Sequence, residues 1–329
     1  MADAQTPDGD SVASSQSEGG VGFNPLEFGM TPHGPRMLSG FSAWISHIPF
    51  AFVAMEIIRP AVLVELGTAG GDSYFSFCQA VVELGLPTRC TAIDTWKGDP
   101  HFGYYSEELF LTLRGYHDPL YGAFSRLLRG EFDQAAVEFP DGSIDLLHID
   151  GCHTYEAVKH DFETWLPKLS RRAVVLFHDT QARHEGFGVW KFWAEVSSGY
   201  PNFEFHHGSG LGVLAVGAEV SPNFLAFLQV ARQYPEVMRA YFASKGSGIE
   251  AENRLVRLCF ELRHQHSLID EWARTAGQAG AAPAPDPALA QSKTVEYARR
   301  LSERLKAVIK ADLDLRQTVS RQVPPGYPS

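Results

Sequence analysis

Residues 61–74 read Ala-Val-Leu-Val-Glu-Leu-Gly-Thr-Ala-Gly-Gly-Asp-Ser-Tyr, and this stretch decides the fold. It opens with four apolar residues, two of them β-branched, which is the pattern of a buried strand. Three glycines then break the strand, and Asp72 or Ser73 is placed to cap a mostly apolar helix. Strand, glycine turn and helix in this order predict the first βα unit of a nucleotide-binding sheet, because glycines let a ligand approach the backbone and a helix N-terminus offers free N–H groups.

The spacing of these glycines differs from the dinucleotide fingerprint. Counted from Gly67, Gly-x-Gly-x-x-Gly would need glycines where Ala69 and Asp72 stand. The pattern present, Glu65-x-Gly67-x-x-x-Gly71, resembles the first motif of class I S-adenosylmethionine (SAM) methyltransferases. In that family an acidic residue closes the strand, and the glycines face the methionine part of the cofactor. The resemblance implies these cofactor-binding residues: Glu65, Gly67, Thr68, Gly71 and Ser73.

Strand and helix patterns alternate beyond this unit. We expect strands at 61–66, 90–94, 125–129, 143–150, 173–177, 203–206 and 210–216, and helices at 72–85, 105–117, 131–138, 154–169 and 187–198. Strands separated by helices predict an α/β fold with a doubly wound, mostly parallel sheet. The closing hairpin makes the last of the seven strands antiparallel. Class I methyltransferases share this Rossmann-like arrangement, whereas nucleotide-dependent dehydrogenases usually lack the antiparallel strand.

Composition shifts predict five parts of the chain. Residues 1–21 have almost no large apolar side chain and are expected to be disordered. Residues 22–220 form the methyltransferase domain, and residues 221–275 form a helical extension. Residues 276–288 are an Ala-, Gly- and Pro-rich linker. Residues 289–329 carry one long helix with a narrow apolar stripe, which predicts either a short coiled coil or a solvated helix.

Composition also narrows the partners and the compartment. The net charge is −11 with no basic patch, so nucleic acid is not an expected partner. The four cysteines are widely spaced without C-x-x-C, which argues against a disulfide framework and fits a reducing cytoplasm. No signal peptide is evident. The most apolar run, residues 41–58, carries a histidine, a proline and a glutamate, so it predicts a packed helix rather than a membrane span.

Two residues after the second strand are candidates for adenosine binding. Asp94 ends that strand, where an acidic side chain can accept hydrogen bonds from both ribose hydroxyls. The alternative is an aspartate that starts a turn. Trp96 follows two residues later, and its ring is expected either to cover the adenine or to pack in the core.

The strongest candidate site lies at the ends of the fourth and fifth strands. Asp150 and His153 follow one strand, and His178 and Asp179 end the next. Ligands of an open parallel sheet lie beyond the carboxyl ends of its strands, so these side chains should share one crevice. They can hold a divalent metal or position a base against a hydroxyl. The alternative is a set of structural charges, and His148, inside the strand, is predicted to be a hydrogen-bonded core histidine.

The motifs at these strand ends carry a closer resemblance. Ile-Asp150-Gly-x-His153-x-Tyr155, followed by Val-Val-Leu-Phe-His-Asp179, resembles sugar O-methyltransferases of macrolide pathways and methyltransferase domains that accompany glycosyltransferases in surface-glycan synthesis. The likeness covers residues 45–217. In the sugar methyltransferases, an Asp on strand four and an acidic pair after strand five bind Mg²⁺, and a His three residues after the first Asp is the base.

The resemblance implies roles for these residues. Asp150 and His153 would be catalytic, Asp150 would also lie beside the cofactor, and Asp150, His178 and Asp179 would be the metal ligands. One carboxylate of the acidic pair is replaced by His178, and imidazole is a poorer Mg²⁺ ligand. Three options therefore stay open: another metal, weaker metal binding, or no metal.

The function these patterns favour is a SAM-dependent O-methyltransferase acting on a hydroxyl of a sugar or glycan. His153 would take the hydroxyl proton while the oxygen attacks the SAM methyl group. A second hypothesis is a non-catalytic SAM-fold scaffold, homo-oligomeric or bound to a glycosyltransferase through the C-terminal helix. A third is a nicotinamide-dependent oxidoreductase. Ala69 argues against it, because the dinucleotide fingerprint needs a glycine at that position.

Overall fold

The structure is a computed structural model that describes residues 34–39, 43–99, 103–255 and 258. The predicted tail 1–21, the linker 276–288 and the C-terminal helix 289–329 lie outside the described residues. Within the described part of the chain, no helix combines the length and the apolar character needed to cross a bilayer.

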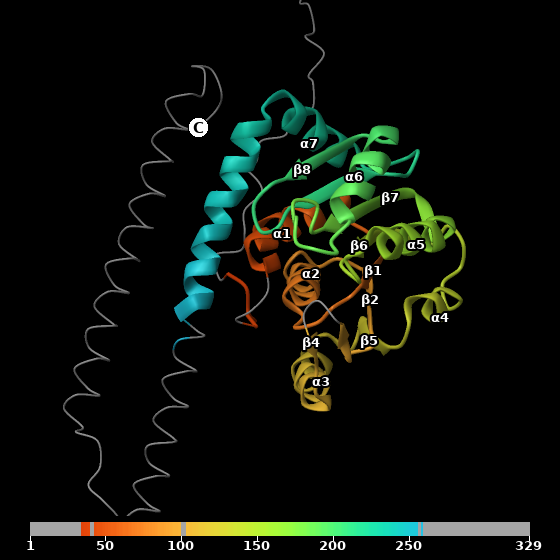
Figure 1. The fold of residues 1–329 in the computed structure, drawn as a ribbon, viewed down its shortest axis with the longest axis vertical. Coiled ribbons are helices and arrows are strands. Elements are labelled where there is room, and N and C mark those ends of the chain that lie inside the picture. The colour runs from red at the N-terminus through yellow and green to blue at the C-terminus, as the bar shows by residue number, and fades with distance from the viewer. Residues whose placement is uncertain (1–33, 40–42, 100–102, 256–257, 259–329) are drawn as a thin grey trace, which may run out of the picture.

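A seven-stranded sheet forms the centre of the molecule (Figure 1). Its strands lie in the order β5-β2-β1-β6-β7-β9-β8. They are β1 (Val62–Leu66), β2 (Arg89–Asp94), β5 (Ser125–Arg129), β6 (Ile144–Ile149), β7 (Leu169–His178), β8 (Asn202–Phe205) and β9 (Leu211–Ala215). All pairings from β5 to β7 are parallel, and β9 is antiparallel to both β7 and β8. The predicted fold class is therefore confirmed.

Two details of the strands were not predicted. β7 begins at Leu169 rather than 173, because Leu169 and the polar residues 170–172 stay extended across a register shift against β6. A separate two-stranded ladder joins β3 (Gly98–Asp99) to β4 (Gly103–Tyr104) beyond the end of β2.

Helices cover both faces of the sheet (Figure 1). Their bounds are α1 (Ile48–Ile58, after a 3-10 turn at Ala43–His47), α2 (Asp72–Glu83), α3 (Glu107–Tyr121), α4 (Phe132–Ala136), α5 (Tyr155–Trp165), α6 (Val189–Val196) and α7 (Pro222–Gln233). α1, α2, α3 and α7 share one hydrophobic core, and α4, α5 and α6 share the other. Because both faces are buried, a central strand such as β6 is apolar along most of its length and buried at every residue.

Two further segments pack over the first core. Residues 34–39 lie along α2, where the Gln79 side chain bonds the backbone of Gly34 and Arg36. After α7, residues 235–255 are helical and lie within the predicted extension 221–275. This helix approaches the start of α1 so closely that a Cβ at Gly246 would overlap the backbone oxygen of Ser46.

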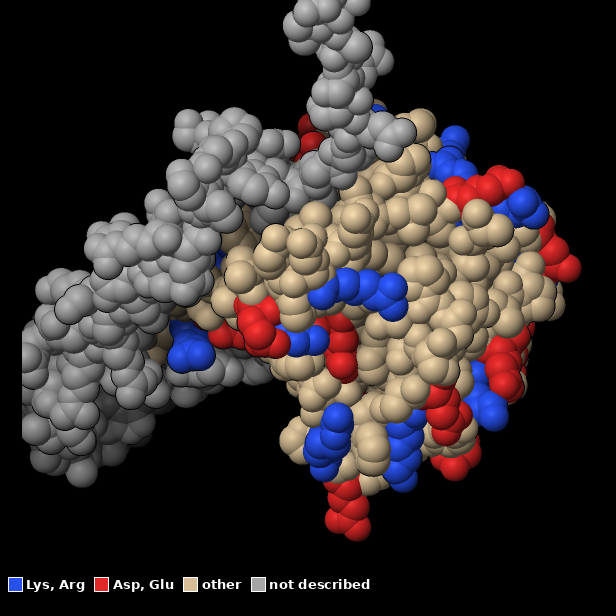
Figure 2. All heavy atoms as spheres, turned by 90° about the horizontal axis from the view of Figure 1, so that it is seen from above, with Lys and Arg blue, Asp and Glu red and all other residues tan. Residues whose placement is uncertain are grey.

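On the face seen in Figure 2, basic and acidic side chains are interspersed around a broad uncharged area. Neither sign forms a continuous field on this face, and the chain as a whole is acidic.

Candidate functional site

The loop after β1 depends on glycines in the left-handed region. Gly67 has φ +84°, and a Cβ there would overlap the backbone oxygen of Asp150 at the end of β6. Gly71 has φ +86°, and a Cβ there would press into the ring of Phe75. The loop therefore runs close against the neighbouring strand end, which only glycine allows at these positions.

The predicted cap of α2 is wrong. The N-cap residue is Gly71, which has no side chain to bond, and Asp72 is already the first helical residue. The Asp72 carboxylate instead accepts hydrogen bonds from the backbone N–H (2.7 Å) and the hydroxyl of Ser39. Ser39, 33 residues earlier in the chain, thus bonds the carboxylate that the sequence pattern predicted to cap the helix. Ser73 is buried within the first turn.

Asp94 holds the glycine loop in place. Its Oδ2 accepts from the amides of Thr68 and Ala69, each at 2.9 Å, and its Oδ1 accepts from the amide of Trp96 at 2.6 Å. Ala69 has φ +42°, an uncommon conformation for a residue with a side chain. The carboxylate therefore serves as the anchor of the loop and as the start of the next turn.

Trp96 does not cover an open ligand site. Only 1% of the residue is exposed, its ring packs against Phe110 at 4.8 Å, and its Nε1 donates to the Ala69 carbonyl at 3.3 Å. Of the two alternatives predicted for Trp96, covering the adenine or packing in the core, this environment favours packing in the core. The ring supports the loop from within.

Glu65 is fully buried and bonded to a histidine. Its Oε2 accepts from Nδ1 of His148 at 2.8 Å, and Nε2 of His148 accepts from the indole N–H of Trp44 at 3.0 Å. The expectation of a hydrogen-bonded core histidine at 148 is confirmed. Burial raises the pKa of this carboxyl, although hydrogen bonds from His148 and Ser73 oppose the shift. Trp44 was not singled out from the sequence, since a lone tryptophan in an apolar segment indicates only packing.

The ends of β6 and β7 bring the predicted catalytic residues together. Asp150, His153 and Asp179 each offer one ligand atom within 4.8 Å of the others. Nε2 of His153 lies 2.9 Å from Oδ2 of Asp179, and the ring of Phe187 stacks on His153 at 4.6 Å. Asp179 has φ +61°, so the backbone after β7 turns sharply to aim its carboxylate at His153.

His178 lies beside the same carboxylates. Its Nδ1 is 3.1 Å from Asp150 and 3.4 Å from Asp179, and its Nε2 donates to the carbonyl of Gly208 at 2.9 Å. Although burial favours the neutral ring, the two carboxylates raise the pKa of His178 well above its usual value. Burial likewise opposes ionisation of Asp150 and Asp179, yet the neighbouring His178 holds the pKa of each below its usual value.

The structure therefore differs from the predicted metal set of Asp150, His178 and Asp179. The donor that joins the two carboxylates is His153, and His178 uses both ring nitrogens in hydrogen bonds. A protonated ring nitrogen has no lone pair for a metal. Sequence reasoning missed this because Gly208 is 30 residues from His178 in the chain.

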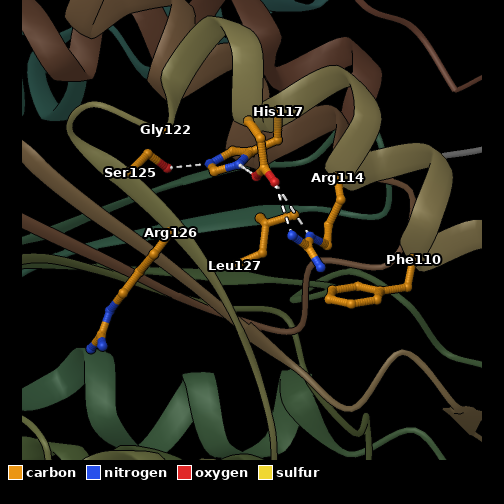
Figure 3. A pocket seen from close by; sticks show the side chains of 8 residues that line it. Phe110, Arg114, His117, Gly122, Ser125, Arg126 and Leu127 are labelled. Carbon is orange, nitrogen blue, oxygen red and sulfur yellow. Dashed lines mark hydrogen bonds and ion pairs between the residues drawn. The ribbon is translucent and has the colours of Figure 1, made fainter.

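A surface hollow lies elsewhere, between α3 and β5 (Figure 3). Its volume is about 450 Å³, and it contains His117 bonded to Asp118 and to Ser125. Arg114 is paired with the same Asp118. None of the predicted site residues lines this hollow, so it is separate from the glycine loop and from the side chains at the ends of β6 and β7.

Known proteins resemble this chain to different extents. Residues 64–180 match the family described as a methyltransferase domain. The uncharacterized protein y4gI of Sinorhizobium fredii is 49% identical over 187 residues, which is 57% of this chain and 20% of that protein. The chain thus spans one fifth of the length of this relative.

Two solved structures are similar in part. The O-methyltransferase TomG from Streptomyces achromogenes, in complex with SAM, has 13% identity and a TM-score of 0.40, with 55% of this chain and 91% of that chain covered. The O-methyltransferase from Bacillus cereus, in complex with SAH, has 14% identity and a TM-score of 0.39, with 50% and 79% covered.

The family match runs from β1 to the residue after Asp179. It therefore includes the glycine loop, Asp94 and the side chains at the ends of β6 and β7. The order and directions of the seven strands are those of the class I fold. Residues 64–180 are therefore similar to a methyltransferase domain, and they lie in a sheet with the predicted Rossmann-like arrangement.

Proposed function

We propose that this protein is a SAM-dependent O-methyltransferase that methylates a hydroxyl of a sugar or glycan-type acceptor. The observation that carries the proposal is the pair of His153 and Asp179, 2.9 Å apart, next to the glycine loop of a methyltransferase domain. Gly67 touches Asp150, so the loop and the pair lie against the same strand end. Transfer of a methyl group to oxygen needs in-line placement and removal of one proton, and no protein nucleophile.

In this proposal His153 is the general base. Its Nε2–H donates to Asp179, so the basic lone pair lies on Nδ1. Nδ1 takes the hydroxyl proton as the acceptor oxygen bonds to the methyl carbon, and the carbon–sulfur bond of SAM breaks. S-adenosylhomocysteine leaves, and Asp179 stabilises the imidazolium that has formed.

The cofactor would lie over the loop after β1. Gly67 and Gly71 let this loop pass close to the Asp150 backbone and the Phe75 ring, with Thr68 and Ser73 between and after them. Asp94 accepts three amide bonds, and a carboxylate has roughly four lone-pair sites, so it keeps capacity for a ribose hydroxyl. Glu65 stands fully buried at the base of the loop, bonded to His148.

Two aromatic rings support a ring-shaped acceptor. Phe187 stacks on His153, and Trp190 is half-buried with the Arg183 guanidinium 4.7 Å from its ring. Aromatic faces suit the apolar faces of sugars. Beyond the site, a cytoplasmic location, a homo-oligomer and a glycosyltransferase partner for residues 289–329 remain predictions.

The first test is isothermal titration with SAM, in Mg²⁺ and again in EDTA. We expect binding in both conditions, followed by transfer from labelled SAM to members of a nucleotide-sugar and glycan panel. If SAM binds in neither buffer, the proposal fails and the scaffold hypothesis replaces it. Titration with NADH should show no binding, and binding there would favour the oxidoreductase hypothesis instead.

A further inference from the structure

The hydrogen bonds of His178 determine its charge. The carbonyl of Gly208 can only accept, so Nε2 of His178 carries a hydrogen. An ionised Asp150 can also only accept, so Nδ1 carries one too. His178 is thus an imidazolium, 5% exposed, with no lone pair for a metal.

The carbonyl that receives this proton is fixed in place. Gly208 has φ +53°, and a Cβ there would overlap the Ser46 hydroxyl. The same carbonyl lies 3.1 Å from Nε2 of His47, whose ring is 5.7 Å from that of His178. Burial lowers the pKa of His47, so that ring is neutral. The positive charge on this side of the two carboxylates therefore belongs to His178.

This charge changes what the cluster can bind. Asp150 and Asp179 carry two negative charges, and His178 balances one of them at 3.1 and 3.4 Å. A divalent cation among Asp150, His153 and Asp179 would lie next to the imidazolium and be repelled by it. The residues as arranged do not fit a divalent metal.

We infer that His178 takes the place of the metal: a buried imidazolium holds Asp150 and Asp179 and makes this methyl transfer independent of a divalent cation. His178 is a positioning residue, because both of its N–H groups are committed to protein oxygens. By pairing with both carboxylates it keeps Asp179 directed at His153. The inference rests on the proposed function, and it predicts that the base is assembled before any ligand binds.

The test exchanges His178 for the carboxylate that the resembling enzymes carry. Mn²⁺ is titrated calorimetrically into the SAM-loaded wild type, His178→Asp and a control, His206→Asp. The control makes the same substitution at a half-exposed histidine of the turn after β8. We expect binding only to His178→Asp. Transfer by the wild type should be unchanged in EDTA, whereas transfer by His178→Asp should fall about tenfold or more.

A measurement on the wild type keeps the inference testable if His178→Asp does not fold. Nitrogen-15 NMR of the ring should show both nitrogens of His178 protonated at neutral pH. A bare ring nitrogen, Mn²⁺ binding by the wild type, or loss of its transfer in EDTA would each overturn the inference. The NMR and metal titrations need no turnover, and SAM binding is measured separately, so failure here is distinct from failure of the proposed function.

Discussion

Two sets of carboxylates lie at the same edge of the sheet, and different donors hold them. Asp94 accepts hydrogen bonds from three backbone amides, whereas Asp150 and Asp179 accept from imidazole rings. A backbone amide does not titrate near neutral pH, but an imidazole does. The first arrangement gives a rigid loop, and the second gives a place where a proton can move. The comparison teaches that one sheet edge combines a carboxylate held by backbone amides with carboxylates held by imidazoles, to which the proposed function assigns cofactor positioning and acid–base chemistry.

The largest effect is expected from removing the freedom of the loop. Gly67→Ala adds a methyl group that overlaps the Asp150 backbone at φ +84°. We expect SAM binding to be lost in calorimetry, because β1 and β6 can no longer close on each other. The control is Gly142→Ala, with φ +71° and open space around its Cβ. It should cost only about 1–2 kcal/mol of stability and leave SAM binding intact. Equal loss in both variants would contradict the role of the contact.

The next largest effect is expected from removing an imidazole that holds one of these carboxylates. His153→Ala removes the proposed base, so methyl transfer should fall about 10²- to 10⁴-fold while the Kd for SAM stays close to that of the wild type. The matched control is His160→Ala, an exposed histidine on the next helix, paired with Asp133. Unchanged transfer in His153→Ala would rule out its role as the base.

A third carboxylate, Asp161, extends the comparison to a group whose pKa is set mainly by burial rather than by hydrogen-bond donors. Burial raises the pKa of Asp161 on α5 from 3.8 to about 7. The unfolded chain then loses this proton near pH 4 and the folded chain near pH 7. Stability from this group is fully present below about pH 4, falls as pH rises, and is constant above about pH 7.

Asp161→Asn removes this pH dependence. At about 1.4 kcal/mol per pKa unit, the shift sets an upper limit of about 4 kcal/mol on the gain in the free energy of unfolding at pH 8. Urea unfolding at pH 5 and pH 8 should show a larger gain at pH 8. Glu163→Gln, an exposed carboxylate on the same helix, is the control and should show no such difference. A gain that is equal at both pH values would contradict the shift.

The smallest effect is expected from weakening the amide-bound carboxylate. Asp94→Asn keeps the shape of the side chain. Its amide has one acceptor oxygen, whereas both oxygens of the Asp94 carboxylate accept hydrogen bonds. SAM affinity should fall about tenfold, since a hydrogen bond to a charged group is worth about 1.5–3 kcal/mol. The change should be independent of pH between 6 and 9, because the donors do not titrate. Calorimetry with Asp118→Asn, a half-exposed carboxylate of α3, supplies the control. Full affinity in Asp94→Asn would show that the loop does not depend on this anchor.

Much of the site could be predicted from local pattern. Asp150, His153 and Asp179 were assigned to one crevice because neighbouring parallel strands end at the same sheet edge, and the structure brings them together. The side-chain surroundings that local pattern did not predict depend on partners far along the chain. Trp96 is enclosed partly by Phe110, and no spacing rule connects those two residues.

The sequence by itself determined that a sheet forms, the succession of its strands and helices along the chain, and the residues at its carboxyl edge. Hydrophobic periodicity and glycine placement are local properties, so they can be seen in one dimension. Only the tertiary structure decided the hydrogen-bond partners of His178 and of Asp72. A hydrogen-bonding side chain takes whichever donor or acceptor folding places beside it, and here those were Gly208 and Ser39.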